Sequence, residues 1–177
     1  PFYTAQGGFN VEGFAATLRQ AGAKRGKVIT ILNFPNNPTG YSPTRTEAEA
    51  IGRAVRSVAE SGIHVVCVCD DAYFGLFYEP DVCTESVFAQ LAGAHPRLLA
   101  VKGDAATKEL FVWGLRVGFL AFSIGGVPAE SPLYAALEKK VSGIIRSVMS
   151  NCAMPSQQAA LKALASPAFV AEHAAKA

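Results

Sequence analysis

Five polar side chains of this sequence have types and spacings that could carry out chemistry together. They are an amide, a carboxylate, a phenol, an amine and a guanidinium: Asn37, Asp70, Tyr73, Lys108 and Arg116. The amine and the guanidinium lie eight positions apart in a segment that contains glycines. A lysine becomes a nucleophile toward an aldehyde when neighbouring groups lower its proton affinity. The set therefore indicates Schiff-base chemistry at a lysine, provided that the fold brings the other polar groups close to it.

Two short apolar runs predict the strands that position the first three of these residues. Residues 27–32 are apolar at nearly every position, as expected of an inner strand in a parallel sheet covered by helices, and residues 65–69 form a second buried strand. Asn37, Asp70 and Tyr73 follow these runs. Ligands of open α/β sheets bind beyond the carboxyl ends of the strands. We therefore expect these three side chains at one ligand-binding edge.

Helical periodicity predicts the elements that cover this sheet. Asn10 caps a first helix, in which Phe14 and Leu18 point inward. Residues 44–61 form an amphipathic helix. Its apolar positions recur at helical spacing: Ala48, Ile51, Val55, Val58 and Ala59. A short helix is expected over residues 86–92.

The segment around Lys108 decides the direction of the last strand. Residues 98–102 and 117–122 are mostly apolar and predict a third and a fourth strand. The segment between them leaves no room for a full crossover helix of the kind that parallel connections need, so this pair is expected to be antiparallel. The sequence therefore predicts an α/β fold with a mostly parallel sheet that is covered by helices and contains one antiparallel strand.

The rest of the chain is predicted to be helical. A long helix over residues 131–150 carries apolar residues in helical register, and a second helix covers residues 154–164. A last helix is expected to start after Ser166, with Pro167 at its first position. No internal repeat or low-complexity tract interrupts this pattern.

The composition indicates a compact domain that acts on small molecules. The chain has 177 residues, of which 50% are hydrophobic and 17% charged, and its formal net charge is +2. This balance predicts neither a nucleic-acid-binding face nor a polybasic membrane signal. No apolar run approaches the roughly 20 residues that span a bilayer, and no signal peptide is recognised, so we expect a cytoplasmic protein. Because the first residue is Pro1 rather than Met, we expect the chain to belong to a larger protein.

The cysteines indicate free thiols rather than a disulfide framework or a metal site. They are few and irregularly spaced: Cys67, Cys69, Cys83 and Cys152. Cys67 and Cys69 share one face of a predicted strand, and His64 is close in sequence, but a second pair of metal ligands is missing. We therefore expect buried, apolar cysteines and no metal.

Three ordered motifs contain the candidate site residues. Asn-Pro-Thr-Gly occupies residues 37–40, Asp-x-Ala-Tyr occupies residues 70–73, and Lys-x7-Arg-x-Gly runs from Lys108 to Gly118. In this order and spacing they resemble the fold-type I aminotransferases that use pyridoxal 5'-phosphate (PLP), the aspartate aminotransferase family of class I and II. The resemblance implies the large domain of that fold and the transfer of an amino group between an amino acid and a 2-oxo acid.

The resemblance also implies the roles of the lysine and the first aspartate. Lys108 would form the aldimine with the cofactor and then shuttle the proton between the substrate α-carbon and the cofactor. Asp70 would pair with the protonated ring nitrogen, because a carboxylate within hydrogen-bond reach favours the charged form of the ring. Asp71 would face elsewhere.

The other polar edges of the cofactor are assigned by the same resemblance. Asn37 and Tyr73 would donate hydrogen bonds to the ring phenolate, and Arg116 would bind the phosphate with its planar fork. The family usually has a serine that binds the phosphate three positions before the lysine, and this chain has Ala105 there. Thr107 is the hydroxyl residue that we assign to the cofactor site, and we expect the phosphate to be held less well.

By the same resemblance, the chain covers only the central part of the family's architecture. A phosphate loop and a ring-stacking aromatic lie upstream in relatives, and the small domain with the arginine for the substrate carboxylate lies downstream. Residues 1–150 would then be part of the PLP-binding core, and residues 151–177 would lead toward the small domain. Arg146, Ser147 and Asn151 fall where relatives reach across a dimer interface, so we expect a full-length homodimer and an inactive isolated chain.

Each motif alone has an ordinary structural explanation. Asn-Pro-Thr-Gly is a turn sequence, Asp70 could cap a helix, and Lys108 and Arg116 could be solvated surface charges. Their ordered combination favours the aminotransferase. Two alternatives stay open, namely a PLP-dependent β-eliminating lyase that would use the same residues and a non-catalytic truncated core or regulator domain.

Overall fold

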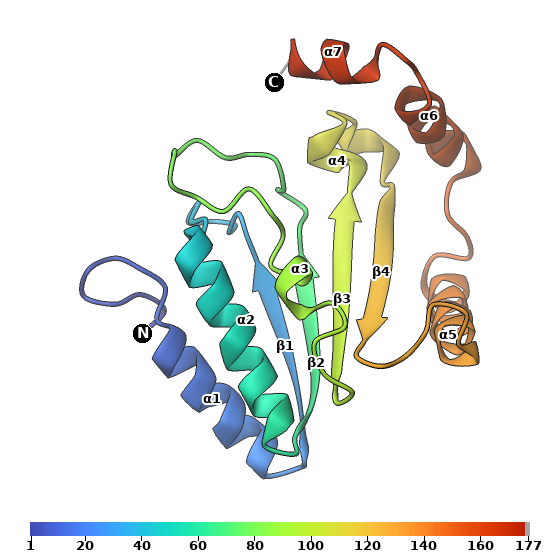
Figure 1. Ribbon diagram of the computed structural model, residues 1–177. Helices are drawn as coiled ribbons and strands as arrows, with labels where there is room; N and C mark the ends of the chain where they lie inside the picture. The colour runs from blue at the N-terminus through green and yellow to red at the C-terminus, as the bar shows by residue number, and fades with distance from the viewer. Residues whose placement is uncertain (176–177) are drawn as a thin grey trace. The chain divides into compact units, whose positions relative to one another are not determined.

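The computed structural model describes residues 1–175, except the side chain of Trp113, as an α/β protein (Figure 1). Its elements in chain order are α1 (Val11–Ala23), β1 (Lys27–Asn33), α2 (Arg45–Glu60), β2 (His64–Asp70), α3 (Phe88–Leu91), β3 (Leu98–Ala105), α4 (Ala106–Glu109), the 3-10 turn η1 (Trp113–Leu115), β4 (Gly118–Ile124), α5 (Pro132–Val148), α6 (Met154–Leu164) and α7 (Phe169–Ala174). The chain divides into two compact units. The first contains Pro1–Asp104 and Leu120–Pro128, and the second contains Ala105–Phe119 and the chain from residue 129 onward.

The four strands form one sheet in the order β1-β2-β3-β4. The first three run parallel, and their register places Asn33 opposite Asp70 and Asp70 opposite Gly103. β4 lies beside β3 and runs in the opposite direction (Figure 1). The predicted sheet, mostly parallel with one antiparallel strand, is confirmed. Its register brings the carboxyl ends of the three parallel strands level with one another.

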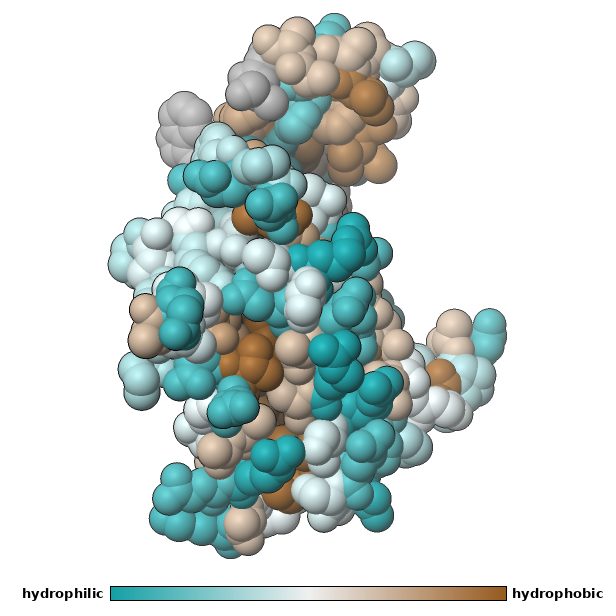
Figure 2. All heavy atoms as spheres, turned by 60° about the vertical axis from the view of Figure 1, so that its left-hand side comes forward, coloured by the Kyte–Doolittle hydropathy of each residue, from teal (hydrophilic) through white to brown (hydrophobic). Residues whose placement is uncertain are grey.

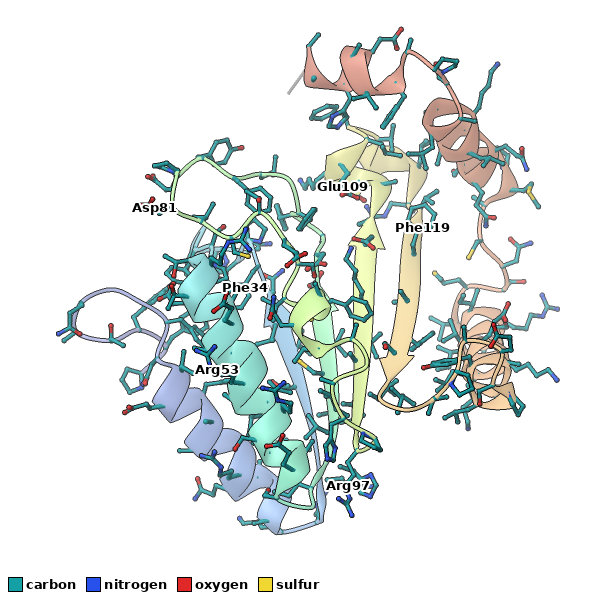
Figure 3. All side chains as sticks on the ribbon, viewed as in Figure 1. Phe34, Arg53, Asp81, Arg97, Glu109 and Phe119 are labelled. Atoms are coloured by element: carbon teal, nitrogen blue, oxygen red, sulfur yellow. The ribbon has the colours of Figure 1, made fainter. Side chains whose placement is uncertain are left out.

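The core of the first unit lies between the sheet and the helices α1 and α2. The apolar stripe of α2 is buried over its whole length, as its period predicts. Aliphatic side chains dominate this core: Leu18, Leu32, Ile51, Val55, Val58, Val65, Leu91 and Leu98. The outer surface of the helices is mainly hydrophilic (Figure 2). It carries ion pairs along α2, such as the one between Glu49 and Arg53. The side chain of Arg53 points away from the sheet (Figure 3).

The position of β1 differs from the prediction of an inner strand covered on both faces. β1 is an edge strand of the described sheet. Its side chains alternate between the two faces, so Val28 and Leu32 are buried under the helices whereas Ile29 and Ile31 are 72% and 66% exposed. The physical reason is that α1 and α2 cover only the face to which Val28 and Leu32 point.

A polar cluster joins the N-terminal segment to the start of α2. Thr44 and Glu47 form a reciprocal capping box, which satisfies two backbone N–H groups at the helix start. The Tyr41 hydroxyl donates to Oε1 of Glu47 at 2.7 Å, and the backbone N–H of Phe9 donates to the same oxygen at 2.9 Å. Burial and the hydrogen bond to Glu47 raise the pKa of Tyr41 to about 12. Burial opposes the charge of Glu47, but hydrogen bonds from Thr44, Tyr41 and Phe9 outweigh it and lower its pKa.

The second unit contains α5, α6, α7 and the segment around Lys108, which includes α4 and η1. α5 and α6 cover most of the ranges predicted for them, although α5 buries none of its residues. The last helix begins at Phe169, so the prediction that Pro167 is its first residue is wrong. The reason is a turn at Ser166, whose carbonyl accepts from the N–H of Phe169 at 3.1 Å and whose hydroxyl accepts from that of Ala168 at 3.3 Å. This turn precedes the helix and occupies the place of its predicted first residues.

The cysteines match the prediction of buried free thiols in part. Cys67, Cys69 and Cys83 are free and buried, whereas Cys152 is free but exposed. A hydrogen bond to Cys67, together with burial, raises the pKa of the Cys69 thiol. Residues 1–175 contain no cluster of three or more histidine, cysteine or acidic side chains that could hold a metal ion. In the same part of the chain, no helix has the length and apolar character needed to cross a membrane.

Candidate active site

The loop after β1 holds its shape through its own side chains. Oδ1 of Asn33, the last residue of β1, accepts from the backbone N–H of Asn37 at 2.8 Å. Oδ1 of Asn36 accepts from the Thr39 hydroxyl at 2.7 Å, and the chain then turns at Gly40, whose φ is +73°. A positive φ suits glycine, because it has no Cβ to clash with the backbone. The loop thus fixes Asn37 at the end of its strand.

Asn37 and Tyr73 meet although 36 positions separate them in the sequence. Nδ2 of Asn37 donates to the Tyr73 hydroxyl at 3.2 Å. A second bond joins the two strand ends, because Nδ2 of Asn33 donates to the carbonyl of Asp70 at 3.1 Å. The first unit therefore assembles an amide, a phenol and a carboxylate at the carboxyl ends of β1 and β2. This is the grouping that the sequence predicted for these three residues.

Asp70 and Asp71 face opposite sides of the sheet. Asp70 ends β2, and its side chain follows the alternation of Val66 and Val68, which are only partly buried. Its Oδ1 accepts from the backbone N–H of Ala72 at 3.2 Å. Asp71 is 3% exposed on the face that the helices cover. Only Asp70 can therefore present its carboxylate on the open face of the sheet.

The second unit contains the other three predicted residues. Thr107 and Lys108 belong to α4, whose last residue, Glu109, is labelled in Figure 3. Arg116 has a left-handed backbone with φ 52° and ψ 50°, and its Nη1 lies 3.3 Å from the Thr107 hydroxyl. The backbone N–H of Ala106 donates to the carbonyl of Val117 at 3.0 Å, which closes the segment at its base. The Arg116 guanidinium thus contacts the Thr107 hydroxyl, and Thr107 directly precedes Lys108 in the sequence.

Lys102, six positions before Lys108, lies among carboxylates. Lys102 forms an ion pair with Asp71, its Nζ lying 3.3 Å from Oδ2, and it hydrogen-bonds Asp104. Burial alone would lower the pKa of Lys102, but the hydrogen bond to Asp104 and the charges of Asp71 and Asp104 outweigh it, so the pKa is raised. A lysine held protonated in this way is a poor nucleophile. Lys102 is therefore a poor candidate for the reactive amine.

Sequence reasoning missed two groups of residues near the predicted site. The first is the charged cluster around Lys102, which the sequence could have revealed, because a lysine near the end of one strand and an aspartate after its neighbour fall on the same buried face. The second is His173 of α7, whose Nε2 donates a hydrogen bond to the carbonyl of Glu109. Its ring also stacks on Phe111 with centroids 5.3 Å apart. No sequence signal links these residues, which lie more than 60 positions apart.

Comparison with known proteins identifies the family. The family described as aminotransferase class I and II matches residues 2–177. The LL-diaminopimelate aminotransferase of Desulforudis audaxviator (strain MP104C) is 32% identical over 128 residues, which cover 70% of this chain and 29% of that protein. The chain therefore spans less than a third of the length of this relative.

Solved structures share the fold at lower sequence identity. An aminotransferase from Anaerococcus prevotii has a TM-score of 0.83 and 21% identity, over 97% of this chain and 41% of the other. The aromatic-amino-acid aminotransferase from Burkholderia pseudomallei, covalently bound to pyridoxal phosphate, has a TM-score of 0.68 and 23% identity, over 98% of this chain and 40% of the other. These likenesses confirm the predicted fold class. The match to the family along nearly its whole length shows that the chain belongs to the class I and II aminotransferase family.

Proposed function

We propose that the protein transfers an amino group between an amino acid and a 2-oxo acid with PLP as its cofactor. The family match and the name of the diaminopimelate relative support a transferase. The observation that carries the assignment to individual residues is the position of Lys108. It lies next to Thr107, which contacts Arg116, while the neighbouring Lys102 is held protonated by two carboxylates.

The residues predicted for the site fit the polar groups of PLP by their chemistry. The cofactor has a phosphate, a phenolate, a ring nitrogen and an aldehyde. For the phosphate the chain offers the guanidinium of Arg116 and the hydroxyl of Thr107, and for the phenolate it offers the amide of Asn37 and the phenol of Tyr73. The carboxylate of Asp70 suits the ring nitrogen, and the amine of Lys108 suits the aldehyde. Each donor or acceptor is of the type that its counterpart requires. The donor set is therefore suited to this cofactor.

In this proposal the first unit binds and tunes the ring. Asn37 and Tyr73, which already share a hydrogen bond, donate to the phenolate oxygen and stabilise its negative charge. Asp70 accepts a hydrogen bond from the ring nitrogen and keeps it protonated, since a nearby anion favours the cationic form. When bound, PLP withdraws electrons from the substrate α-carbon through its ring.

The residues of the second unit hold the phosphate and move the proton. Arg116 and Thr107 donate to the phosphate oxygens, the guanidinium through its planar fork. Lys108 binds the aldehyde carbon in the resting enzyme. With the substrate bound, the Lys108 amine would carry the proton between the substrate α-carbon and the cofactor.

The full-length protein is further proposed to be a cytoplasmic homodimer. The dimer rests on the family resemblance, by which Arg146, Ser147 and Asn151 fall where relatives reach across a dimer interface. It fits α5, whose apolar side chains Leu133, Ile144 and Val148 are exposed. The location rests on analogy with the cytoplasmic aspartate aminotransferase of Saccharomyces cerevisiae, which has a TM-score of 0.68 and 18% identity. The division into a core of residues 1–150 and a following helical segment belongs to the same proposal.

Borohydride reduction of the full-length protein, followed by peptide mapping, tests the role of Lys108. We expect the pyridoxyl group on Lys108 and no label in the Lys108→Ala variant. Label on Lys102, or on no lysine, would contradict the assignment. Incubation with an amino acid and a 2-oxo acid then distinguishes the reactions, because transfer yields a new amino acid and a new oxo acid, whereas β-elimination releases ammonia.

A further inference from the structure

A charged cluster lies behind the candidate site, on the helix-covered face of the first unit. The Lys102 ammonium contacts three side chains from β3 and the segment that follows β2: it pairs with Asp71 at 3.3 Å, hydrogen-bonds Asp104 and lies 5.4 Å from the ring centroid of Phe74. The side chains of Lys102 and Asp104 are 21% exposed and that of Asp71 is 4% exposed. The proposed reaction uses none of these groups.

The cluster holds both ends of the turn from Asp71 to Phe74, which carries Tyr73 and directly follows Asp70. The backbone N–H of Phe74 donates to the carbonyl of Asp71 at 2.9 Å, which closes the turn, and the N–H of Asp71 donates to the carbonyl of Gly103 at 2.9 Å, which ties it to β3. Lys102 binds Asp71 at the first end of this turn and Phe74 at the second. It therefore contacts the residues that directly follow the two proposed cofactor ligands.

Stability alone does not explain the ion pair between Lys102 and Asp71, because burying charges costs free energy of desolvation. Oδ2 of Asp71 is buried, and among the described residues the partner that balances its charge is the Lys102 ammonium at 3.3 Å. Burial raises the pKa of Asp71, although Ser86 and Lys102 hold that rise back. Apolar residues of similar volume are often at least as stabilising as a buried ion pair, whose best-attested use is to fix one geometry among several. Such a geometric role fits a pair located directly behind the candidate site.

We propose that Lys102 is a positioning residue that orients Asp70 and Tyr73 toward the cofactor by clamping their turn through Asp71 and Phe74. This inference rests on the proposed function, because it presumes that Asp70 and Tyr73 contact PLP. Lys102 touches neither substrate nor cofactor. Misplacement of a reacting group by about 1 Å can cost on the order of a hundredfold in rate, so a clamp of this kind matters for the reaction.

The test compares three variants of the full-length protein. Lys102→Met keeps the length of the side chain and removes its charge, Lys102→Arg keeps the charge, and Lys24→Met is a matched control at an exposed position. We expect Lys102→Met to weaken PLP binding, measured by absorbance titration, about tenfold, which corresponds to about 1.4 kcal/mol. It should also move the pH at which the bound chromophore changes colour, because Asp70 and Tyr73 set the charge of the ring. Lys102→Arg should restore most of both properties, and Lys24→Met should match the wild type.

Hydrogen exchange of the cofactor-free protein gives a readout that does not depend on the reaction. The amide of Phe74 should exchange about tenfold faster in Lys102→Met than in the wild type, because the turn opens more often. If Lys102→Met does not fold, Phe74→Leu removes one contact of the clamp without leaving a buried carboxylate unpaired, and it should shift the same pH midpoint. If the folded variants bind PLP, change colour with pH and exchange the Phe74 amide as the wild type does, the proposed role of Lys102 is wrong. A wild-type protein that binds no PLP would instead overturn the proposed function.

Discussion

Two adjacent aspartates with identical side chains occupy opposite environments, and this difference can be measured. Asp70 is partly exposed on the open face of the sheet, and Asp71 is 3% exposed beside Lys102. We predict that Asp70→Asn lowers kcat by at least about a hundredfold, because the ring nitrogen loses the anion that keeps it protonated. Asp71→Asn should cost about tenfold or less, since Asp71 acts only through the turn. Steady-state kinetics on the full-length protein test this, and equal losses in both variants would reject the assignment.

The contact between Arg116 and Thr107 yields a second prediction at the scale of single residues. If both side chains bind the phosphate, Arg116→Lys should weaken PLP affinity about ten- to hundredfold, because an ammonium cannot reproduce the planar fork of a guanidinium. Thr107→Val should weaken it by a similar factor, since it removes one hydrogen bond to the charged phosphate, worth about 1.5–3 kcal/mol. Equilibrium dialysis with PLP measures both. An Arg116→Lys protein with wild-type affinity would remove Arg116 from the site.

At the scale of elements, the polar cluster between the N-terminal segment and α2 predicts how stability depends on pH. Hydrogen bonds lower the pKa of Glu47 below its ordinary value of 4.5, so its contribution is complete above that value and is lost as the pH falls through the folded pKa. We predict that Glu47→Gln lowers the free energy of unfolding by about 2 kcal/mol at pH 7, in line with hydrogen bonds to a charged group. The difference should be smaller at pH 3 than at pH 7. Chemical denaturation at both pH values tests this, and a difference that stays constant with pH would contradict it.

Tyr41 makes the stability of the fold decrease, rather than increase, as the pH rises in the alkaline range. Its pKa is raised from 10.0 to about 12, so the folded state keeps the proton more tightly than the unfolded state. The resulting stabilisation is complete below pH 10 and is lost as the pH rises toward 12. We predict that the wild type loses stability over this interval and that Tyr41→Phe, which has no proton to lose, shows a smaller slope. Thermal unfolding between pH 9 and 11 measures the two slopes, and parallel curves would exclude a role for Tyr41.

Most elements were predictable from periodicity, because each buries one face and the burial pattern repeats along the sequence. α2 is the clearest case, since all five of its predicted apolar positions are buried. The predictions for β1 and for the start of α7 failed because they depend on contacts and turns outside the strand or helix itself. An apolar strand such as β1 has the same sequence whether helices cover one face or two, and the turn at Ser166 competes with a helix start at Pro167 in a way that local propensity does not decide.

The candidate site was predictable to a similar degree. Asn37, Asp70 and Tyr73 could be assigned because a strand end, a parallel register and a familiar motif all lead to the same edge. The choice between Asp70 and Asp71 also follows from alternation along β2. The Lys102 clamp could not be derived in full, because its contact with Phe74 depends on the path of the turn after β2. Packing between segments distant in sequence, such as His173 on Phe111, leaves no periodic signal at all.

At the scale of the whole molecule, the described chain exposes apolar side chains on β1 and on α5. Ile29 and Ile31 of the edge strand β1 are largely exposed, and no residue of α5 is buried. The chain spans 41% of the Anaerococcus structure and 29% of the diaminopimelate relative. Exposed edge strands and apolar faces favour association with other chains. The 177 residues alone should therefore self-associate, which sedimentation velocity at several concentrations would detect.

The same 177 residues should bind PLP weakly and should not transaminate, although they contain Lys108. By resemblance to the family, the upstream phosphate loop and the downstream substrate-carboxylate arginine lie outside them, and Ala105 offers no hydroxyl to the phosphate. Each charge-assisted hydrogen bond to the phosphate is worth about 1.5–3 kcal/mol, so the loss of two would weaken binding by roughly two to four orders of magnitude. Absorbance titration of the isolated chain and of the full-length protein measures this ratio. A saturable micromolar band in the isolated chain that responds to added glutamate or alanine would show that these residues suffice for both binding and transfer.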